Sequence, residues 1–162
     1  MALYRRIFPS YKWTDAWLVN QIVNLPVTIG REKIGFANGV PPETVKSSDA
    51  AIARWIRDSM DGCSCLVVFV GEETYLSRWV KYEMELAEKY KMGRIMIDLT
   101  GMRRTNGSVC RGGPDPFLWH GLHRGLLDPD YYEIKRYSWL PSGRFWIGKW
   151  LEDAYQRAAH LR

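Results

Sequence analysis

The sequence has 162 residues, of which 46% are hydrophobic and 25% are charged, with a formal net charge of +5. This length and apolar content suit one compact domain with a sizeable core, which we expect to span residues 1–162. No run of about 18 apolar residues could cross a membrane, and residues 1–13 lack the apolar core and cleavage site of a secretion signal. We therefore expect a soluble cytoplasmic protein with no membrane partner.

Charge and cysteine content exclude further classes of protein. The basic residues are scattered, as in the pair Arg103-Arg104, and form no long run, so a nucleic-acid partner is not indicated. The same charge would also attract a small phosphate-bearing ligand. The three cysteines include no CxxC pair, and His120 and His123 have no well-placed third ligand. We expect reduced structural cysteines, surface histidines and no metal site.

The first part of the chain predicts a strand and a helix. Residues 3–8 are aromatic and β-branched, which favours a strand whose pairing is stopped by Pro9. An apolar stripe at helical spacing then runs from Trp17 to Leu25 and ends before Pro26. These patterns predict a first strand followed by a first helix.

Residues 27–48 predict a long mobile loop. The segment holds three glycines, adjacent prolines and several charges, with one short possible strand around residues 33–36. Loops of this length inside a compact domain are often functional, so the segment is a candidate lid over a ligand site, with a plain surface loop as the alternative. Ser48 or Asp49 then caps a second helix, which Gly62 ends.

The centre of the chain predicts a buried strand followed by an amphipathic helix. Residues 65–70 are continuously apolar, which is typical of a strand covered on both faces of a parallel sheet, and Gly71 closes the run. Ser77 is a plausible cap for the next helix. One side of that helix carries residues at spacings of three and four, namely Trp79, Val80, Glu83, Met84 and Ala87.

Glu83 is the residue for which we predict a chemical role. Its place in the apolar stripe turns the carboxyl toward protein, and the preceding turn lies at the carboxyl end of a strand, where open α/β sheets bind ligands. A half-buried carboxylate beside such a crevice is a candidate catalytic group. The alternative is a boundary glutamate whose carboxyl reaches solvent.

The remaining elements complete an α/β pattern. Residues 94–99 predict another buried strand after a helix ended by Gly93, residues 101–130 show no firm element, and residues 131–140 allow a late strand. A helical stripe from Ile147 to Leu161 predicts a closing helix. Strands alternating with helices indicate a three-layer, flavodoxin-like domain with a mainly parallel sheet.

Motif searches exclude several enzyme classes. The sequence has no GxGxxG after the first strand, no GxxxxGK[ST], no GxSxG and no HExxH. Classical dehydrogenases, P-loop NTPases, serine hydrolases and zinc proteases therefore lose their main support.

Several segments together resemble one known family, and the resemblance covers most of the chain. The order of elements is similar to that of the bacterial TIR-like family that includes the ThsB proteins of Thoeris antiphage defence, and the telling segments are SDAAIARWIRDSM, CSCLVVFVGEET, SRWVKYEMELA and RYSWLPSGRFWIGKWLEDA. TIR enzymes that hydrolyse NAD carry a catalytic glutamate after a Trp-Val pair, which corresponds to Glu83. The resemblance implies NAD or a related nucleotide as substrate, with no separate cofactor.

The resemblance also implies substrate-binding residues. The segment IFPSY is similar to the first-strand segment of the family, where an aromatic residue and a serine line the nucleotide site, and it implies Phe8, Ser10 and Tyr11. We add Trp79, from the Trp-Val pair, and Asp98, the polar end of the next predicted strand. The chain departs from the family at Pro9, where an apolar residue is usual, and at Leu99, near an asparagine of some relatives.

The function that the resemblance implies is cleavage of the nicotinamide–ribose bond of NAD, giving an ADP-ribose-derived nucleotide signal in antiphage defence. A cyclic product is the first expectation, and linear or conjugated ADP-ribose are the alternatives. A carboxylate facing the developing sugar cation is sufficient for this step, because the leaving group is already cationic. The signal implies a receiving effector protein, and TIR enzymes often act as homo-oligomers. The alternatives are a non-catalytic TIR-like assembly module and a nucleoside deoxyribosyltransferase-like enzyme.

Overall fold

A single mixed sheet organises the protein. The structure, a computed structural model, describes residues 4–29 and 32–162, and within these ranges six strands pair in the order β2-β3-β1-β4-β5-β6. The strands are β1 (Tyr4–Ser10), β2 (Val27–Ile29), β3 (Glu32–Phe36), β4 (Cys63–Val70), β5 (Gly93–Asp98) and β6 (Lys135–Ser138). Four of the five pairings are parallel, and β2 runs antiparallel to β3. The predicted mainly parallel α/β fold is confirmed.

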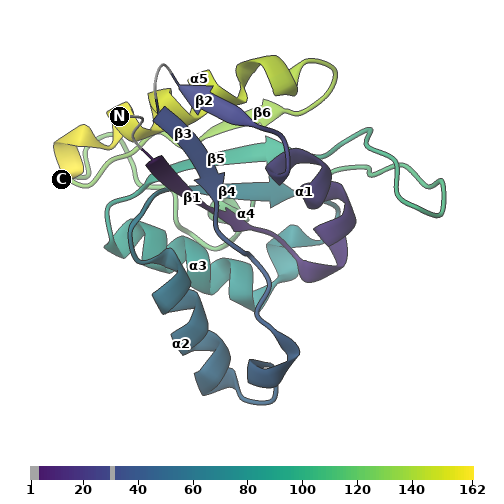
Figure 1. Ribbon diagram of the computed structural model, residues 1–162. Helices are drawn as coiled ribbons and strands as arrows, with labels where there is room; N and C mark the ends of the chain where they lie inside the picture. Colours follow the sequence, from purple (N-terminus) through teal and green to yellow (C-terminus); the bar gives the residue numbers. More distant parts are fainter. Residues whose placement is uncertain (1–3, 30–31) are drawn as a thin grey trace.

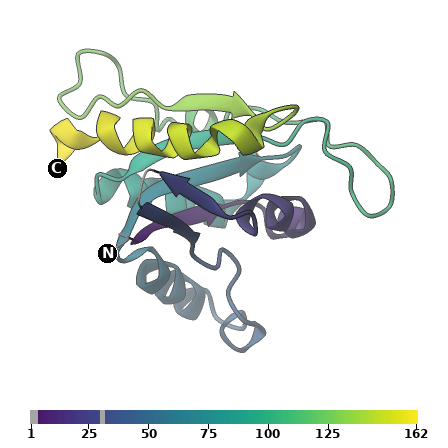
Figure 2. The ribbon, with the colours of Figure 1, turned by 45° about the horizontal axis from the view of Figure 1, so that its top comes forward.

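Helices cover both faces of the sheet and make three layers, with α2 and α3 on one side and α5 on the other (Figures 1 and 2). The helices are α1 (Ala16–Val23), α2 (Asp49–Met60), α3 (Arg78–Lys89), α4 (Pro116–Trp119) and α5 (Gly143–Arg157). Among the described residues, none of these helices has the length and apolar content of a membrane span.

The central strand β4 explains why its sequence shows no alternation. Each of its last six residues is fully buried. Leu66, Val68 and Val70 pack in the core on the α2 and α3 side. Cys65, Val67 and Phe69 pack on the opposite side, with α1 and α5. Because both faces are covered, apolar residues are required at every position.

Two local predictions at helix starts are confirmed. Ser48 caps α2, and its Oγ accepts a hydrogen bond from the Ala51 N–H at 3.3 Å. Ser77 caps α3, and its Oγ accepts one from the Val80 N–H at the same distance. Each cap satisfies one of the free N–H groups in the first turn of its helix.

The prediction that Pro9 stops the first strand was wrong. Strand β1 continues to Ser10, and Pro9 lies opposite Val67 of β4. The carbonyl of Ile7 accepts a hydrogen bond from the N–H of Ala37, just after β3 ends, so Ile7 faces that neighbour. Alternation then turns Pro9 to the same side, beyond the end of β3, where no strand requires the N–H that proline lacks.

The prediction that residues 27–48 form one long loop was also wrong in its first half, whereas the short strand allowed around residues 33–36 is confirmed as β3. Strands β2 and β3 make an antiparallel hairpin, and β3 pairs with β1. Residues 30 and 31 lie outside the described residues. The irregular connection that remains runs from residue 37 to residue 48, and one short 3-10 turn, Glu43–Val45, lies within it.

Three further expectations need correction. Helix α3 ends at Lys89, not at Gly93, because Lys91 takes the left-handed conformation (φ 57°) that turns the chain into β5. Trp17, placed in the core stripe of the first helix, is 56% exposed. The segment 101–130, in which no element was predicted, contains the short helix α4. Asp115 caps α4, since its Oδ1 accepts a hydrogen bond from the Leu118 N–H.

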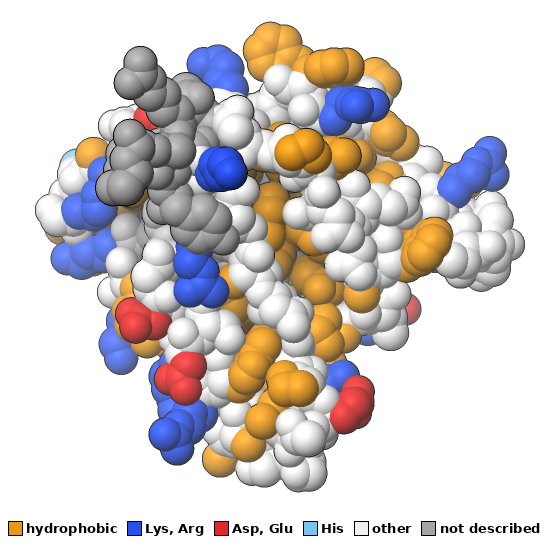
Figure 3. Space-filling model, viewed as in Figure 1, with side chains coloured by type: hydrophobic (Ala, Val, Ile, Leu, Met, Phe, Trp, Pro, Cys, Tyr) orange, Lys and Arg blue, Asp and Glu red, His pale blue; other side chains and the backbone are white. Residues whose placement is uncertain are grey.

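The positively charged side chains are dispersed over the surface. On the face shown in Figure 3, hydrophobic side chains lie across the middle and Lys and Arg side chains are dispersed around the edge. No long basic stripe forms on this face, in agreement with the scattered basic residues of the sequence.

The dependence of the fold on β4 can be tested with one matched pair of leucines. Leu66→Ala removes a fully buried side chain and should lower the free energy of unfolding by about 2–5 kcal/mol, because a cavity is left in the core. Leu127→Ala changes a fully exposed leucine and should alter the free energy by less than about 0.5 kcal/mol. Urea denaturation measures both values, and equal effects would contradict the assigned core.

Candidate active site around Glu83

Glu83 lies at the centre of the candidate site and is almost completely buried. It is 1% exposed, on the side of α3 that also carries the fully buried Val80, Met84 and Ala87. The helical period that places these residues on one side also directs the Glu83 carboxyl at the sheet. The prediction that this carboxyl points toward protein is confirmed. The alternative, a boundary glutamate whose carboxyl reaches solvent, is excluded for this conformation.

Ser10 is the direct partner of Glu83. It is the last residue of β1 and is fully buried, and its Oγ donates a hydrogen bond to Glu83 Oε1 at 3.1 Å. Phe8 lies two residues earlier on the same face of the strand and is fully buried in the core below. The structure thus brings Ser10 and Glu83 together across 73 residues of sequence and places Phe8 in the core.

Tyr11 completes the group at the end of β1. Its ring packs edge-on against Phe69 with 6.4 Å between the ring centroids, and the residue is 5% exposed. Burial, together with the charge of Glu83, raises the pKa of Tyr11 to about 12. The phenol therefore keeps its proton at neutral pH.

The state of the Glu83 carboxyl is set by its burial. Loss of solvent raises the pKa of Glu83 well above its ordinary value, and the hydrogen bond from Ser10 only partly offsets this. Burial thus favours the neutral acid. A cation brought beside Glu83 would favour the carboxylate instead.

The chain after β3 covers the end of β1. The N–H of Ala37 bonds to the carbonyl of Ile7 at 2.8 Å. Gly39 follows so closely that an added Cβ would lie 2.5 Å from the Pro9 carbonyl oxygen and 2.7 Å from the Tyr11 ring. Only a glycine permits this approach. Residues 37–48 therefore begin directly over the strand end that holds Ser10.

Two of the predicted binding residues make their polar or ring contacts with groups other than Ser10 and Glu83. Trp79, one turn before Glu83 on α3, is partly buried against Tyr82, and the Arg78 guanidinium lies over its ring at 4.9 Å. Asp98 ends β5, and its Oδ2 accepts a hydrogen bond from Arg136 at 2.7 Å. Among the described side chains, no hydrogen bond or ion pair joins either residue to Glu83. Asp98 instead joins β5 to β6.

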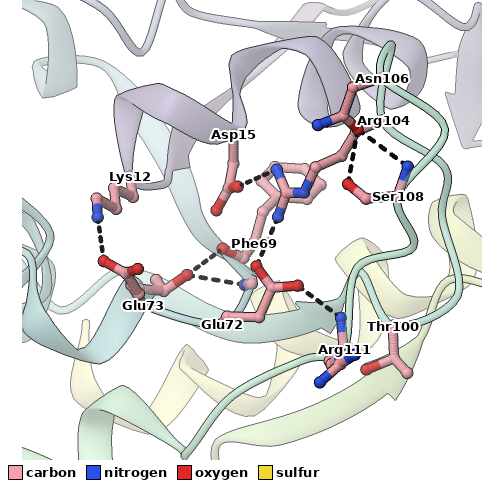
Figure 4. A network of polar contacts seen from close by, with 12 residues as sticks. Lys12, Asp15, Phe69, Glu72, Glu73, Thr100, Arg104, Asn106, Ser108 and Arg111 are labelled. Carbon is pink, nitrogen blue, oxygen red and sulfur yellow. Dashed lines mark hydrogen bonds and ion pairs between the residues drawn. The ribbon is translucent and has the colours of Figure 1, made fainter.

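A polar network beside the site was not predicted. Arg104, in the segment after β5, donates to Asp15 Oδ1 at 2.9 Å and to Glu72 Oε2 at 2.8 Å (Figure 4). Glu72 Oε1 also accepts the N–H of Arg111 at 2.7 Å, and this bond, with Arg104, lowers the pKa of Glu72. Lys12 pairs with Glu73 nearby (Figure 4). The network ties three separate segments together at the carboxyl ends of the strands.

Glycines make this network possible. A Cβ on Gly71 would lie 2.5 Å from Asp15 Oδ2, and a Cβ on Gly113 would lie 2.4 Å from the Gly71 carbonyl oxygen. From the sequence, Arg104 was identified only as one of a basic pair in a stretch with no firm element. Glycines and acidic residues were visible in the sequence as possible parts of a polar network, but which of them contact one another depends on the fold.

The arrangement of these elements defines the class of the protein. A mainly parallel sheet carries, at the carboxyl ends of its strands, a buried glutamate from the helix after the central strand, which is the arrangement that the resemblance to TIR-like domains implies. Residues 8–104 match the family model described as "Thoeris protein ThsB, TIR-like domain". The chain belongs to this ThsB TIR-like family.

A curated relative agrees with this assignment. The chain is 27% identical over 152 residues to the "Putative cyclic ADP-D-ribose synthase ThsB1" of Bacillus cereus (strain MSX-D12). The matched region covers 91% of this chain and 74% of that relative. The similarity therefore extends beyond the segment that the family model matches.

The buried state of Glu83 predicts a pH-dependent stability. At acid pH, below the unfolded-state pKa of about 4.3, Glu83 is protonated in both the folded and the unfolded chain. As the pH rises, the unfolded chain loses this proton before the folded one, so Glu83 lowers stability by up to about 1.4 kcal/mol per pH unit until its raised pKa is reached. Glu83→Gln should therefore melt higher than the natural protein at neutral pH.

Thermal melts between acid and neutral pH would measure this difference. Glu85→Gln is the matched control, because Glu85 is exposed on the same helix. The melting temperature of Glu85→Gln should change with pH in the same way as that of the natural protein. If the melting temperature of Glu83→Gln does not rise relative to that of the natural protein as the pH increases, the Glu83 carboxyl is not desolvated in solution.

Proposed function

We propose that this protein is a TIR-type enzyme that cleaves the nicotinamide–ribose bond of NAD and forms a cyclic ADP-ribose-derived signal in antiphage defence. The observation that carries the proposal is a single carboxyl, Glu83, held by Ser10 at the carboxyl ends of the strands and screened from solvent. The name of the Bacillus cereus relative supports the same chemistry. A separate effector protein would receive the product.

Cleavage of the nicotinamide–ribose bond requires little of the protein beyond one negative charge at the correct position. Cleavage breaks the bond between the nicotinamide nitrogen and the ribose carbon, and the electron pair leaves with nicotinamide. The sugar keeps a positive charge, which a carboxylate in a dry site stabilises strongly. Glu83 would supply this charge, with one of its oxygens oriented by Ser10.

The substrate would itself ionise Glu83. Its pyridinium ring is a cation, and a cation close to a buried carboxyl lowers the pKa of that carboxyl. The raised pKa of Glu83 without ligand is therefore compatible with a carboxylate in the complex. The free protein avoids a buried unpaired charge until the substrate is present.

The acceptor determines the product. An oxygen or nitrogen of the same nucleotide would attack the sugar carbon, lose its proton and close a ring, whereas water would give linear ADP-ribose. A site closed by residues 37–48 would exclude water and so favour the cyclic product.

The main competing function is a non-catalytic assembly module. The observation in its favour is that Glu83 is 1% exposed, so no substrate reaches it in this conformation. Incubation with NAD, and separately with deoxynucleosides, followed by mass spectrometry distinguishes these functions. Product from NAD supports the proposal, product from deoxynucleosides supports a deoxyribosyltransferase, and no product from either supports the module.

Glu83→Gln tests the catalytic role. The amide keeps the size of the side chain but removes the charge, and turnover of NAD should fall by on the order of 100-fold or more. Glu85→Gln should have little effect, because two residues further along the helix it is rotated by about 200° and is exposed. Equal effects of the two substitutions on turnover would exclude Glu83 as the catalytic group.

The covering segment should respond to ligand. Residues 37–48 begin against the end of β1, and under this proposal they move to admit a nucleotide and repack against it once it is bound. Their amide hydrogens should exchange more slowly when a non-cleavable NAD analogue is added, while those of β4 stay unchanged. Equal exchange of residues 37–48 with and without the analogue would count against a lid.

A further inference from the structure

A second cavity opens beyond the carboxyl ends of β5 and β6. Its volume is about 470 Å³, within the range of small-molecule sites. Its walls come from the end of α1, the segment after β5 and the turn between β6 and α5, which Figures 1 and 2 both place at the same end of the sheet. Most of its lining is apolar and includes Leu25, Met102, Trp139 and Leu140. Neither Ser10 nor Glu83 is among the described residues that line it.

Trp139 gives this cavity a fixed, flat wall. It is 7% exposed, and its carbonyl accepts a hydrogen bond from the N–H of Gly143 at 2.6 Å. A Cβ on Gly143 would lie 2.4 Å from the Trp139 ring, so the first residue of α5 packs directly on the indole. The next residue, Leu140, is 43% exposed. A flat apolar ligand group would therefore meet a preformed wall and cover apolar surface that the protein leaves in water.

Two arginines line the same cavity, and no carboxylate does among its described residues. Arg103 and Arg144 are both exposed, so a ligand can reach them. Arg103 Nη1 donates to the Gly107 carbonyl at 3.3 Å. The Arg144 guanidinium lies over the ring of its neighbour Phe145, and it makes no hydrogen bond or ion pair with the described part of the chain. The cavity thus carries an unbalanced positive charge.

The position of Arg144 is unfavourable for the protein alone. Arg144 is the second residue of α5, at the positive end of the helix dipole, and the first turn of α5 contains no acidic residue. Glu152 and Asp153 line a neighbouring cavity together with Arg144, but they pair with Arg5 and Lys149 instead. An anion in the cavity would balance both the guanidinium and the helix end.

The backbone that carries Arg103 is held in place before any ligand binds. Arg103 is bridged to Val109 across its loop. The next residue, Arg104, bonds to Asp15 and Glu72 in the network described above. Binding at Arg103 therefore orders only a side chain, and not the loop itself.

These features together select the chemistry of the ligand. A guanidinium is a planar fork of donors that matches phosphate and carboxylate oxygens. A phosphate monoester has three such oxygens and about two negative charges, so one group can satisfy two arginines. We propose that this cavity is a second ligand site, which binds a small phosphate monoester with its phosphate at Arg103 and Arg144 and a flat apolar group against Trp139.

Titrations of the whole protein with phenyl phosphate, phenol and inorganic phosphate test the site. Phenyl phosphate carries both recognised groups, and each of the other probes carries one. Phenyl phosphate should shift the backbone NMR signals of residues 101–103 and 139–144 and bind at least about tenfold more tightly than either other probe. Absence of binding, an affinity equal to that of inorganic phosphate, or shifts centred on Ser10 and Glu83 would overturn the proposal.

Two further probes address the main competing occupants. Benzoate presents a carboxylate on the same ring, and tighter binding of benzoate than of phenyl phosphate would overturn the choice of a phosphate. An acidic segment of a second copy could also fill the cavity. In that case the signals of residues 101–103 and 139–144 would shift with protein concentration in the absence of probe, and this result would also contradict the proposal.

Substitution of each arginine should weaken the binding of phenyl phosphate. Arg103→Gln and Arg144→Gln each remove a charged donor and should each lower the affinity by about tenfold. Arg54→Gln is the matched control, because Arg54 is an exposed arginine on α2, on the other side of the sheet, and it should change the affinity by less than about twofold. Equal effects of all three substitutions would show attraction by net charge alone. Melting curves would verify that each variant is folded.

This site and the proposed function can fail separately, because the argument for the cavity uses neither Glu83 nor NAD. Binding of phenyl phosphate at residues 101–103 and 139–144 without NAD turnover would support the second site alone. NAD turnover that depends on Glu83, with no shift at those residues, would support the enzyme alone.

Discussion

The desolvated contact between Glu83 and Ser10 is the constraint on which the site depends. A carboxyl without water is costly, and the fold tolerates this one because β1 and α3 are held by the most buried parts of the core. Ser10 pairs with Val68 of the central strand, so its position is fixed by the sheet. The strand β1 and the helix α3 thus position the buried carboxyl, and the irregular segment after β3 packs against the end of β1.

Much of the fold follows from local sequence patterns. The continuous apolar run of β4 required two covered faces, and the helical spacing around Glu83 fixed which way the carboxyl points. Ser48 and Ser77 were recognisable caps because each lies directly before a helical stripe. These signals depend on a few neighbouring residues, and for that reason the sequence alone was sufficient to find them.

The missed features depend on partners far away in the chain. The hairpin of β2 and β3 is stabilised by pairing with β1, which local composition does not reveal. Pro9 could stay inside a strand only because no neighbour faces its missing N–H. Arg104 joins Asp15 to Glu72, and Asp98 joins Arg136, through contacts that exist only after folding. Ser10 was assigned to the site through family resemblance, and its contact with Glu83 was not predicted, since no spacing rule connects the two residues.

The two sides of the strand ends are held by different forces. On one side, Arg104 bonds two carboxylates at once, so moving that segment would separate several charges. On the other side, Gly39 touches Pro9 and Tyr11 mainly by close packing. One side is therefore held by ion pairs between separate segments, and the other by close packing together with the hydrogen bond from Ala37 to Ile7. Because salt screens exposed charges and leaves close packing unaffected, high ionic strength would loosen the first side and spare the second.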